Sequence, residues 1–207
     1  NKQDIIDLMC VAGIAQEPLL LIGPPGTAKS DIVVKFEDAL GIAQAHVCGA
    51  SMGGMIAQHL GFAHAQRVKS LTLMMTTSGH RSLPKESLKV RRAMLSRPRH
   101  GSTPEQKFEN VLDHYVRLYG VIGSPGYPPA DGYVRSRLQI SVRRSYRPAG
   151  TARQMVAIAA DGDRSSLVAQ IRLPTQIIHG AADPLVPLAA GRDLAAKIPG
   201  AELDVIP

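Results

Sequence analysis

The sequence predicts a three-layer α/β domain, built on a mostly parallel sheet of about five strands with a helical cap insertion. Short apolar runs recur along the chain, and stretches of helical periodicity separate them. The segment at about 80–150 loses sheet periodicity and is interrupted by prolines, which is why we place the cap there. Continuous apolar strands are typical of a parallel sheet covered on both faces. The expected strands are 19–22, 45–48, 68–75, 174–179 and 202–206.

The stretch Ala45–Ala63 combines a strand, a tight turn and a helix, with a serine at the turn. The turn, Gly49-Ala50-Ser51-Met52-Gly53, matches the G-x-S-x-G pattern that places a nucleophilic serine on a strained strand-to-helix corner. We expect Gly49 and Gly53 to be required, because a Cβ at either position would collide with the neighbouring strand or helix. In the helix that follows, Met55, Ile56, Leu60 and Ala63 are expected to share one face.

A second glycine-rich turn lies earlier in the chain. Residues 2–14 predict an amphipathic helix, and Gly23–Ser30 follows the strand at 19–22 and nearly fits the phosphate-binding loop G-x-x-x-x-G-K-S/T, with Ala28 in place of its second glycine. In such a loop, backbone N–H groups face a phosphate at a helix N-terminus. Lys29 would reach the outer phosphates, and Ser30 would hold Mg²⁺ only if a nucleotide binds. The candidate nucleotide-binding residues are Gly23, Gly26, Thr27, Ala28, Lys29 and Ser30.

The sequence of this segment, GPPGTAKS between LLLI and DIVVKF, resembles the MoxR-type AAA+ ATPases over about residues 1–40. The resemblance implies a strand–loop–helix unit, which we expect to pack into the same sheet as the rest. ATP hydrolysis in that family needs an Asp-Glu pair at the end of another strand, and neither Leu71–Met75 nor Ile177–Ile178 supplies one. We therefore expect no efficient hydrolysis. Weak binding of phosphate or of ATP with Mg²⁺, or a loop that stays empty, are the open alternatives.

From about Asp38 to residue 207 the sequence resembles the α/β-hydrolases, in particular the aclacinomycin-methylesterase-like esterases. The resembling phrases are DALGIAQAHVCGASMGGMIAQ, RVKSLTLMMTTSG, RPAGTARQMVAIAADGDRSS and LPTQIIHGAADPLVP. This resemblance implies a carboxylic-ester hydrolase core that requires no cofactor. It implies Ser51 as the nucleophile, Asp183 as the triad acid and the Met52 N–H as an oxyanion donor. A plainer interpretation of Asp183 is that it caps the next helix through Pro184.

The two resemblances meet in the helix that ends at Asp38-Ala39-Leu40-Gly41, which predicts a chimera of the two families. Its hydrolase part is then expected to lack the N-terminal strands, so that an exposed sheet edge could self-associate. Both glycine-rich turns follow parallel strands. We therefore also expect the N–H groups of Gly26–Lys29 to lie near Ser51.

Parts of the catalytic apparatus are expected to be absent. In the resembling esterases the base histidine follows a final I-P-G-x-G-H phrase, whereas here the sequence ends at Ile206-Pro207. The second oxyanion donor belongs to the region that the phosphate loop replaces. His179 is expected to be packed in the core, and His80 could approach Ser51 from the loop after the second strand. The sequence thus predicts a hydrolase scaffold with an incomplete triad, weakly active or inactive. The alternatives are a phosphate binder and an inactive structural chimera.

Composition narrows the partners. The 207 residues are 44% hydrophobic and 20% charged, which suits a globular domain. Residues 81–153 hold 15 Lys/Arg and 5 Asp/Glu, but without interleaved aromatics or a nucleic-acid motif, so we expect a solvated Arg-rich insertion and no nucleic-acid partner. No apolar run is long enough to cross a membrane, and Cys10 and Cys48 lack metal or redox spacing. We expect a cytoplasmic protein that binds a small-molecule ester or a phosphate anion.

Overall fold

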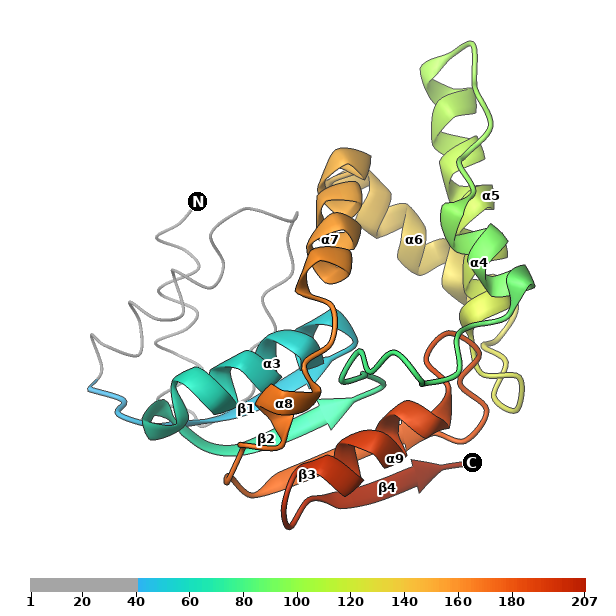
Figure 1. Cartoon of the computed structure of the whole chain (residues 1–207). Coiled ribbons are helices and arrows are strands. Elements are labelled where there is room, and N and C mark those ends of the chain that lie inside the picture. The colour runs from blue at the N-terminus through green and yellow to red at the C-terminus, as the bar shows by residue number, and fades with distance from the viewer. Residues whose placement is uncertain (1–40) are drawn as a thin grey trace.

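The computed structural model describes residues 41–207 of the chain (Figure 1). The predicted helix at 2–14, the strand at 19–22 and the loop Gly23–Ser30 lie outside the described residues. The nucleotide-binding residues, and their predicted closeness to Ser51, therefore stay predictions.

Four strands form one parallel sheet in the order β1-β2-β3-β4. One register row crosses the whole sheet, from Gly49 through Leu73 and Ile177 to Leu203. The α/β class and four of the expected strands are confirmed, with small differences at the strand ends. The strands are Ala45–Ala50 (β1), Val68–Met74 (β2), Thr175–Gly180 (β3) and Glu202–Ile206 (β4).

Helices cover one face of this sheet (Figure 1). They are α3 (Met52–Ala63), α8 (Ser165–Val168) and α9 (Leu188–Lys197), and a short 3-10 turn, Ala65–Arg67, joins α3 to β2. The apolar core lies between them and the sheet, and burial of its side chains stabilises the fold by about 25 cal/mol per Å². Its buried members are Ala57, Val68, Leu71, Leu73, Val168, Ile171, Ile177, Leu194 and Ile198.

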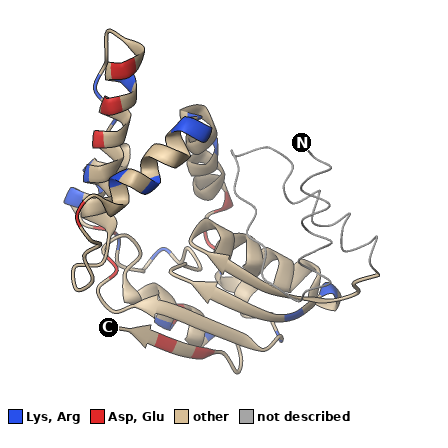
Figure 2. Cartoon of the chain, turned by 180° about the vertical axis from the view of Figure 1, so that it is seen from behind, with Lys and Arg blue, Asp and Glu red and all other residues tan. Residues whose placement is uncertain are grey.

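The opposite face of the sheet carries polar pairs that join neighbouring strands. His46 Nδ1 lies 2.6 Å from Ser70 Oγ, and Gln176 donates to Asp204 over 2.7 Å. Seen from behind, the positions of the acidic residues of β4 are marked in red on the strand at the edge (Figure 2). The described residues thus supply two of the three predicted layers.

Helix α3 packs on the sheet through small side chains. Its buried residues are Gly54, Ala57, Gln58 and Gly61, and a Cβ on Gly61 would come within 2.6 Å of Leu71 Cδ1. Ile56, in contrast, is 51% exposed. The face that carries Met55, Ile56, Leu60 and Ala63 is therefore not the one that packs on the sheet, since none of these four residues is buried.

The cap consists of four helices, which we call the cap helices: α4 (Leu88–Leu95), α5 (Pro104–Ile122), α6 (Tyr133–Arg144) and α7 (Pro148–Asp161). Helices α4 and α6 pack on α5, while α7 leads back toward α3 (Figure 1). Arg135 of α6 binds Glu109 and Asp113 of α5. The predicted cap insertion is confirmed.

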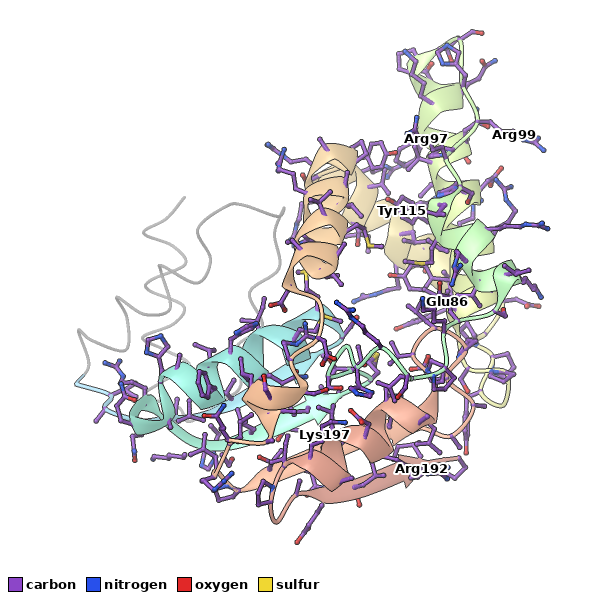
Figure 3. All side chains as sticks on the ribbon, in the orientation of Figure 1. Glu86, Arg97, Arg99, Tyr115, Arg192 and Lys197 are labelled. Atoms are coloured by element: carbon purple, nitrogen blue, oxygen red, sulfur yellow. The ribbon has the colours of Figure 1, made fainter. Side chains whose placement is uncertain are left out.

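Lys and Arg positions are spread along the cap helices (Figure 2). Arg97 and Arg99, between α4 and α5, lie on the outer part of the cap, and Tyr115 of α5 faces the other cap helices (Figure 3). The Tyr115 ring meets that of Tyr146 edge to face, with 6.4 Å between centroids. Within residues 41–207, no helix combines the length and the apolar character that a membrane crossing requires.

Candidate functional site

Ser51 forms the corner between β1 and α3, in a backbone conformation that L-residues avoid. Its φ is 53° and its ψ is −120°. Such a conformation costs about 1–3 kcal/mol, and it persists only where the surroundings impose it. Here the Ser51 N–H donates to the Met74 carbonyl over 2.9 Å, and the Thr76 hydroxyl donates to the Ser51 carbonyl over 2.7 Å. The side chain of Ser51 is exposed, so these bonds hold a serine hydroxyl in the open.

Two glycines at the corner leave no room for a Cβ. The sequence predicted this for one of them. A Cβ on Gly49 would lie 2.3 Å from the carbonyl oxygen of Gly53, so Gly49 is required as expected. A Cβ on Gly53 would meet nothing within 4 Å, so the prediction for Gly53 is wrong. Gly54 takes that role instead, because it faces the sheet and its Cβ would lie 2.6 Å from Thr76 Cγ2.

Met52 is the first residue of α3, directly after the serine. The first N–H groups of a helix have no partner within it, and the helix dipole favours an anion there. Among the described residues, the helix-opening bonds go to Gly54 and Met55, whose N–H groups donate to the Ser51 carbonyl. The role of the Met52 N–H as an oxyanion donor stays a prediction.

Asp183 lies in the turn after β3, at the carboxyl edge of the sheet. Its Oδ1 accepts the N–H groups of Leu185 and Val186, each over 2.9 Å, and its Oδ2 lies 4.0 Å from His179 Nε2. One carboxylate oxygen thus organises the turn. The other is free of a closer partner within residues 41–207. The plainer interpretation is wrong, because the N-cap of α9 is Pro187, without a side-chain cap bond. The acid role of Asp183 stays a prediction.

His179 is 1% exposed, and its Nε2 lies 2.7 Å from the Val186 carbonyl oxygen. Because a carbonyl can only accept, Nε2 carries the proton and donates. The prediction of a packed histidine is confirmed.

No histidine ring in residues 41–207 hydrogen-bonds to the Ser51 hydroxyl. His80 Nδ1 instead lies 2.7 Å from Ser82 Oγ. At the acid's end of the site, the Ala181 N–H donates to the Ile206 carbonyl over 2.7 Å, which holds the end of β4 against the Asp183 turn.

A cavity of about 450 Å³ lies between α3 and α7, beside the corner. Its lining from α3 includes Met52 and Ile56, and its lining from α7 includes Ala157 and Ile158. Ile56 is exposed because it lines this cavity and does not face the sheet. Groups of three or more side chains able to hold a metal ion do not occur in the described part of the chain.

The sequence matches the family profile of the alpha/beta hydrolase fold over residues 27–207. The protein therefore belongs to the α/β-hydrolase family, as its parallel sheet and its serine corner indicate. Residues 1–47 also match the profile of the MoxR domain of the MoxR-vWA-beta-propeller ternary systems.

Two curated relatives illustrate the range of the family. The chain is 29% identical to a pimeloyl-acyl-carrier protein methyl ester esterase of Chromobacterium violaceum, with 90% of this chain and 74% of that protein covered. It is 27% identical to a 2-hydroxy-6-oxononadienedioate/2-hydroxy-6-oxononatrienedioate hydrolase of Cupriavidus pinatubonensis, covering 90% of this chain and 67% of the relative.

Solved structures agree on the fold. An enol-lactonase from Burkholderia xenovorans aligns with a TM-score of 0.61 at 25% identity, covering 84% of this chain and 61% of that one. A hydrolase from Pseudomonas aeruginosa aligns with a TM-score of 0.61 at 23% identity, covering 91% and 66%. The chain thus spans about two thirds of the length of these solved relatives.

Proposed function

We propose that the chain is a serine hydrolase that cleaves small carboxylic esters, with Ser51 as its nucleophile. The observation that carries the proposal is the strained Ser51 backbone, which presents an exposed hydroxyl beside the first N–H groups of α3. Membership of the α/β-hydrolase family and an esterase among the relatives support it.

In this proposal the Ser51 hydroxyl attacks the ester carbonyl carbon and gives its proton to a base, while the Met52 N–H supports the oxyanion. The C–O bond then breaks, the alcohol leaves with the proton, and water hydrolyses the acyl-serine. Because no histidine in residues 41–207 hydrogen-bonds to Ser51, this base is proposed to be water, so we expect slow turnover. Asp183 is proposed to hold the acid position of the triad.

The cavity between α3 and α7 is proposed to hold the apolar part of the substrate. Its volume of about 450 Å³ falls in the range of small-molecule pockets, and Ile56 and Ile158 give it apolar walls. The proposed substrates are therefore esters with a short apolar acyl or alcohol group, and not charged polymers.

Hydrolysis of 4-nitrophenyl butyrate by the purified chain, beside its Ser51→Ala and Ser166→Ala variants, tests the proposal. Ser166 is an exposed serine outside the corner, which makes it a matched control. We expect turnover that Ser51→Ala removes and Ser166→Ala retains. Equal rates in all three folded proteins would exclude Ser51 as the nucleophile.

One observation favours a second candidate function. The MoxR profile match includes Gly23–Ser30, so the chain is also proposed to bind a phosphate or a nucleotide there without efficient hydrolysis, and the chimeric origin remains part of that proposal. Calorimetric titration with ATP and Mg²⁺ would show saturable binding that Lys29→Ala weakens. Identical null titrations for both proteins would reject it.

A further inference from the structure

The two ends of the cap insertion meet in backbone contact. Gly79, which leads into the cap, and Gly162, which leads out of it, both have positive φ angles, of 78° and 65°. A Cβ on Gly79 would lie only 2.2 Å from the Gly162 carbonyl oxygen. Every cap helix lies between these two glycines in the sequence, so the crossing of the two segments is the neck of the cap.

A buried arginine fastens this neck. Arg164 is 3% exposed, and its guanidinium donates to Asp161 Oδ2 over 2.5 Å, to the Gly162 carbonyl over 3.1 Å and to the Thr77 carbonyl over 2.9 Å. Its backbone N–H donates to the Ser78 carbonyl over 2.8 Å. One side chain therefore binds both the segment that enters the cap and the segment that leaves it.

The same guanidinium also reaches the helix that carries the serine corner. Arg164 Nε donates to Gln58 Oε1 over 3.0 Å, and Gln58 is fully buried on the sheet side of α3. Gln58 in turn donates to the Thr77 carbonyl over 3.1 Å, and the neighbouring Thr76 donates to the Ser51 carbonyl. The planar fork of an arginine suits this use, because it holds several acceptors in one fixed geometry.

The rest of the cap offers little to fix its orientation. Within the described residues, the main helix packing of the cap is that of α4 and α6 on α5, and not on the strands. Besides the contacts of Arg164, α7 meets α3 through a partly exposed pair at the neck, with His59 Nε2 lying 2.8 Å from Asp161 Oδ1. Exposed pairs of this kind hold elements together weakly. The placement of α7 over α3, and the cavity between them, therefore depends on the neck.

We propose that the Gly79–Gly162 crossing is the hinge of the cap, and that Arg164 is the positioning residue that holds α7 over α3. Glycines with positive φ at the two ends of a moving unit are the kind of position that absorbs a hinge rotation. Loss of the guanidinium then lets the cap swing and opens the cavity beside Ser51. The hinge does not require that Ser51 be catalytic.

The test measures the distance between spin labels on α3 and α7, which needs no enzyme activity. In the full chain with Cys10 and Cys48 changed to Ser, labels are placed at His64→Cys and Val156→Cys, both at exposed sites. We expect one narrow distance distribution, and a second, longer population in Arg164→Met. Arg135→Gln, which breaks an ion cluster inside the cap, is the matched control and should leave the distribution narrow. A core pair at His64→Cys and Glu202→Cys should not change in any variant.

A purely structural arginine would give a different result. If Arg164 only stabilises the fold, Arg164→Met has a lower melting temperature but an unchanged α3–α7 distance distribution. That outcome would overturn the proposal. Should Arg164→Met fail to fold, Asp161→Asn removes one partner at a partly exposed site, and it must broaden the distribution for the proposal to stand. Where ester turnover is present, cap swinging raises KM more than it lowers kcat. If the protein shows no ester turnover but Arg164→Met broadens the distance distribution, the proposed function is refuted and the hinge proposal stands.

Discussion

At the scale of single residues, the Ser51 corner is held from the sheet side. Thr76 follows β2, is 1% exposed, and both donates to the Ser51 carbonyl and fills the space against Gly54. The G-x-S-x-G pattern could not reveal this residue, because Thr76 lies 25 residues away and touches the corner only through the parallel pairing of β1 with β2. Arg164 was missed for the same reason, since its partners come from three separate elements.

The two adjacent glycines of α3 give a matched pair of substitutions. Gly54→Ala should destabilise the fold by about 1–3 kcal/mol, because its methyl group overlaps Thr76. Gly53→Ala meets open space in a helix, and should be neutral or stabilise by up to about 1 kcal/mol. Urea unfolding of both variants measures the difference. Equal costs for the two substitutions would contradict the packing described for the corner.

The Asp161 carboxylate predicts a pH effect. Burial raises its pKa, but the hydrogen bond with His59 and the charge of Arg164 outweigh burial and hold the pKa below its ordinary value of 3.8. The stabilisation it contributes is therefore complete above pH 3.8, and is lost as pH falls through the lower pKa of the folded state.

Unfolding of wild type and Asp161→Asn at several pH values checks this expectation. The difference in unfolding free energy should be constant at neutral pH and shrink below pH 3.8. Asp131→Asn, at an exposed loop position, serves as the control. A difference that grows toward acid pH would refute the assigned direction.

At the scale of elements, the strands were predictable and the helix faces were not. In Val68–Met74 the apolar Val68, Leu71 and Leu73 are buried and Lys69 is exposed, as suits a strand with one face against the core. The face of α3 could not be found from apolar periodicity, because its contact side consists of Gly54, Ala57, Gln58 and Gly61. Large apolar residues of α3 line a cavity instead, and the local sequence pattern does not predict that cavity.

Helix α5 offers a test of an element on its own. The Thr103 hydroxyl accepts the Gln106 N–H over 3.2 Å at its N-terminus, and Pro104 follows in the first turn. Thr103→Ala should cost about 1 kcal/mol in local stability, whereas Ser102→Ala, one residue earlier, should cost less. Hydrogen exchange of the α5 amides measures both. Equal exchange in the two variants would show that the cap does not depend on this N-cap.

At the scale of the whole molecule, the core and the cap are joined at one place. Because Gly79 and Gly162 are in contact, a short glycine linker in place of residues 80–161 should leave a core that still unfolds cooperatively. Thermal melting of the shortened chain checks this. A shortened chain that never melts cooperatively would show that the cap is part of the folding unit.

The family and the parallel sheet could be read from sequence phrases that surround Ser51 and Asp183. Whether these two residues act in catalysis could not be read from the sequence, because that depends on which groups lie together at the carboxyl edge of the sheet. The structure places Ser51 after β1 and Asp183 after β3, with β2 between these strands, and no histidine ring in residues 41–207 hydrogen-bonds to the Ser51 hydroxyl.

The most direct test of the account is covalent labelling by a fluorophosphonate, which modifies serines in working hydrolase sites. The account predicts one adduct on the peptide that contains Ser51, found by mass spectrometry and absent from Ser51→Ala. It predicts slow labelling, because no histidine ring in residues 41–207 hydrogen-bonds to the Ser51 hydroxyl. An adduct on another residue, or no adduct on a protein that melts cooperatively, would contradict the assignment of Ser51 as the nucleophile.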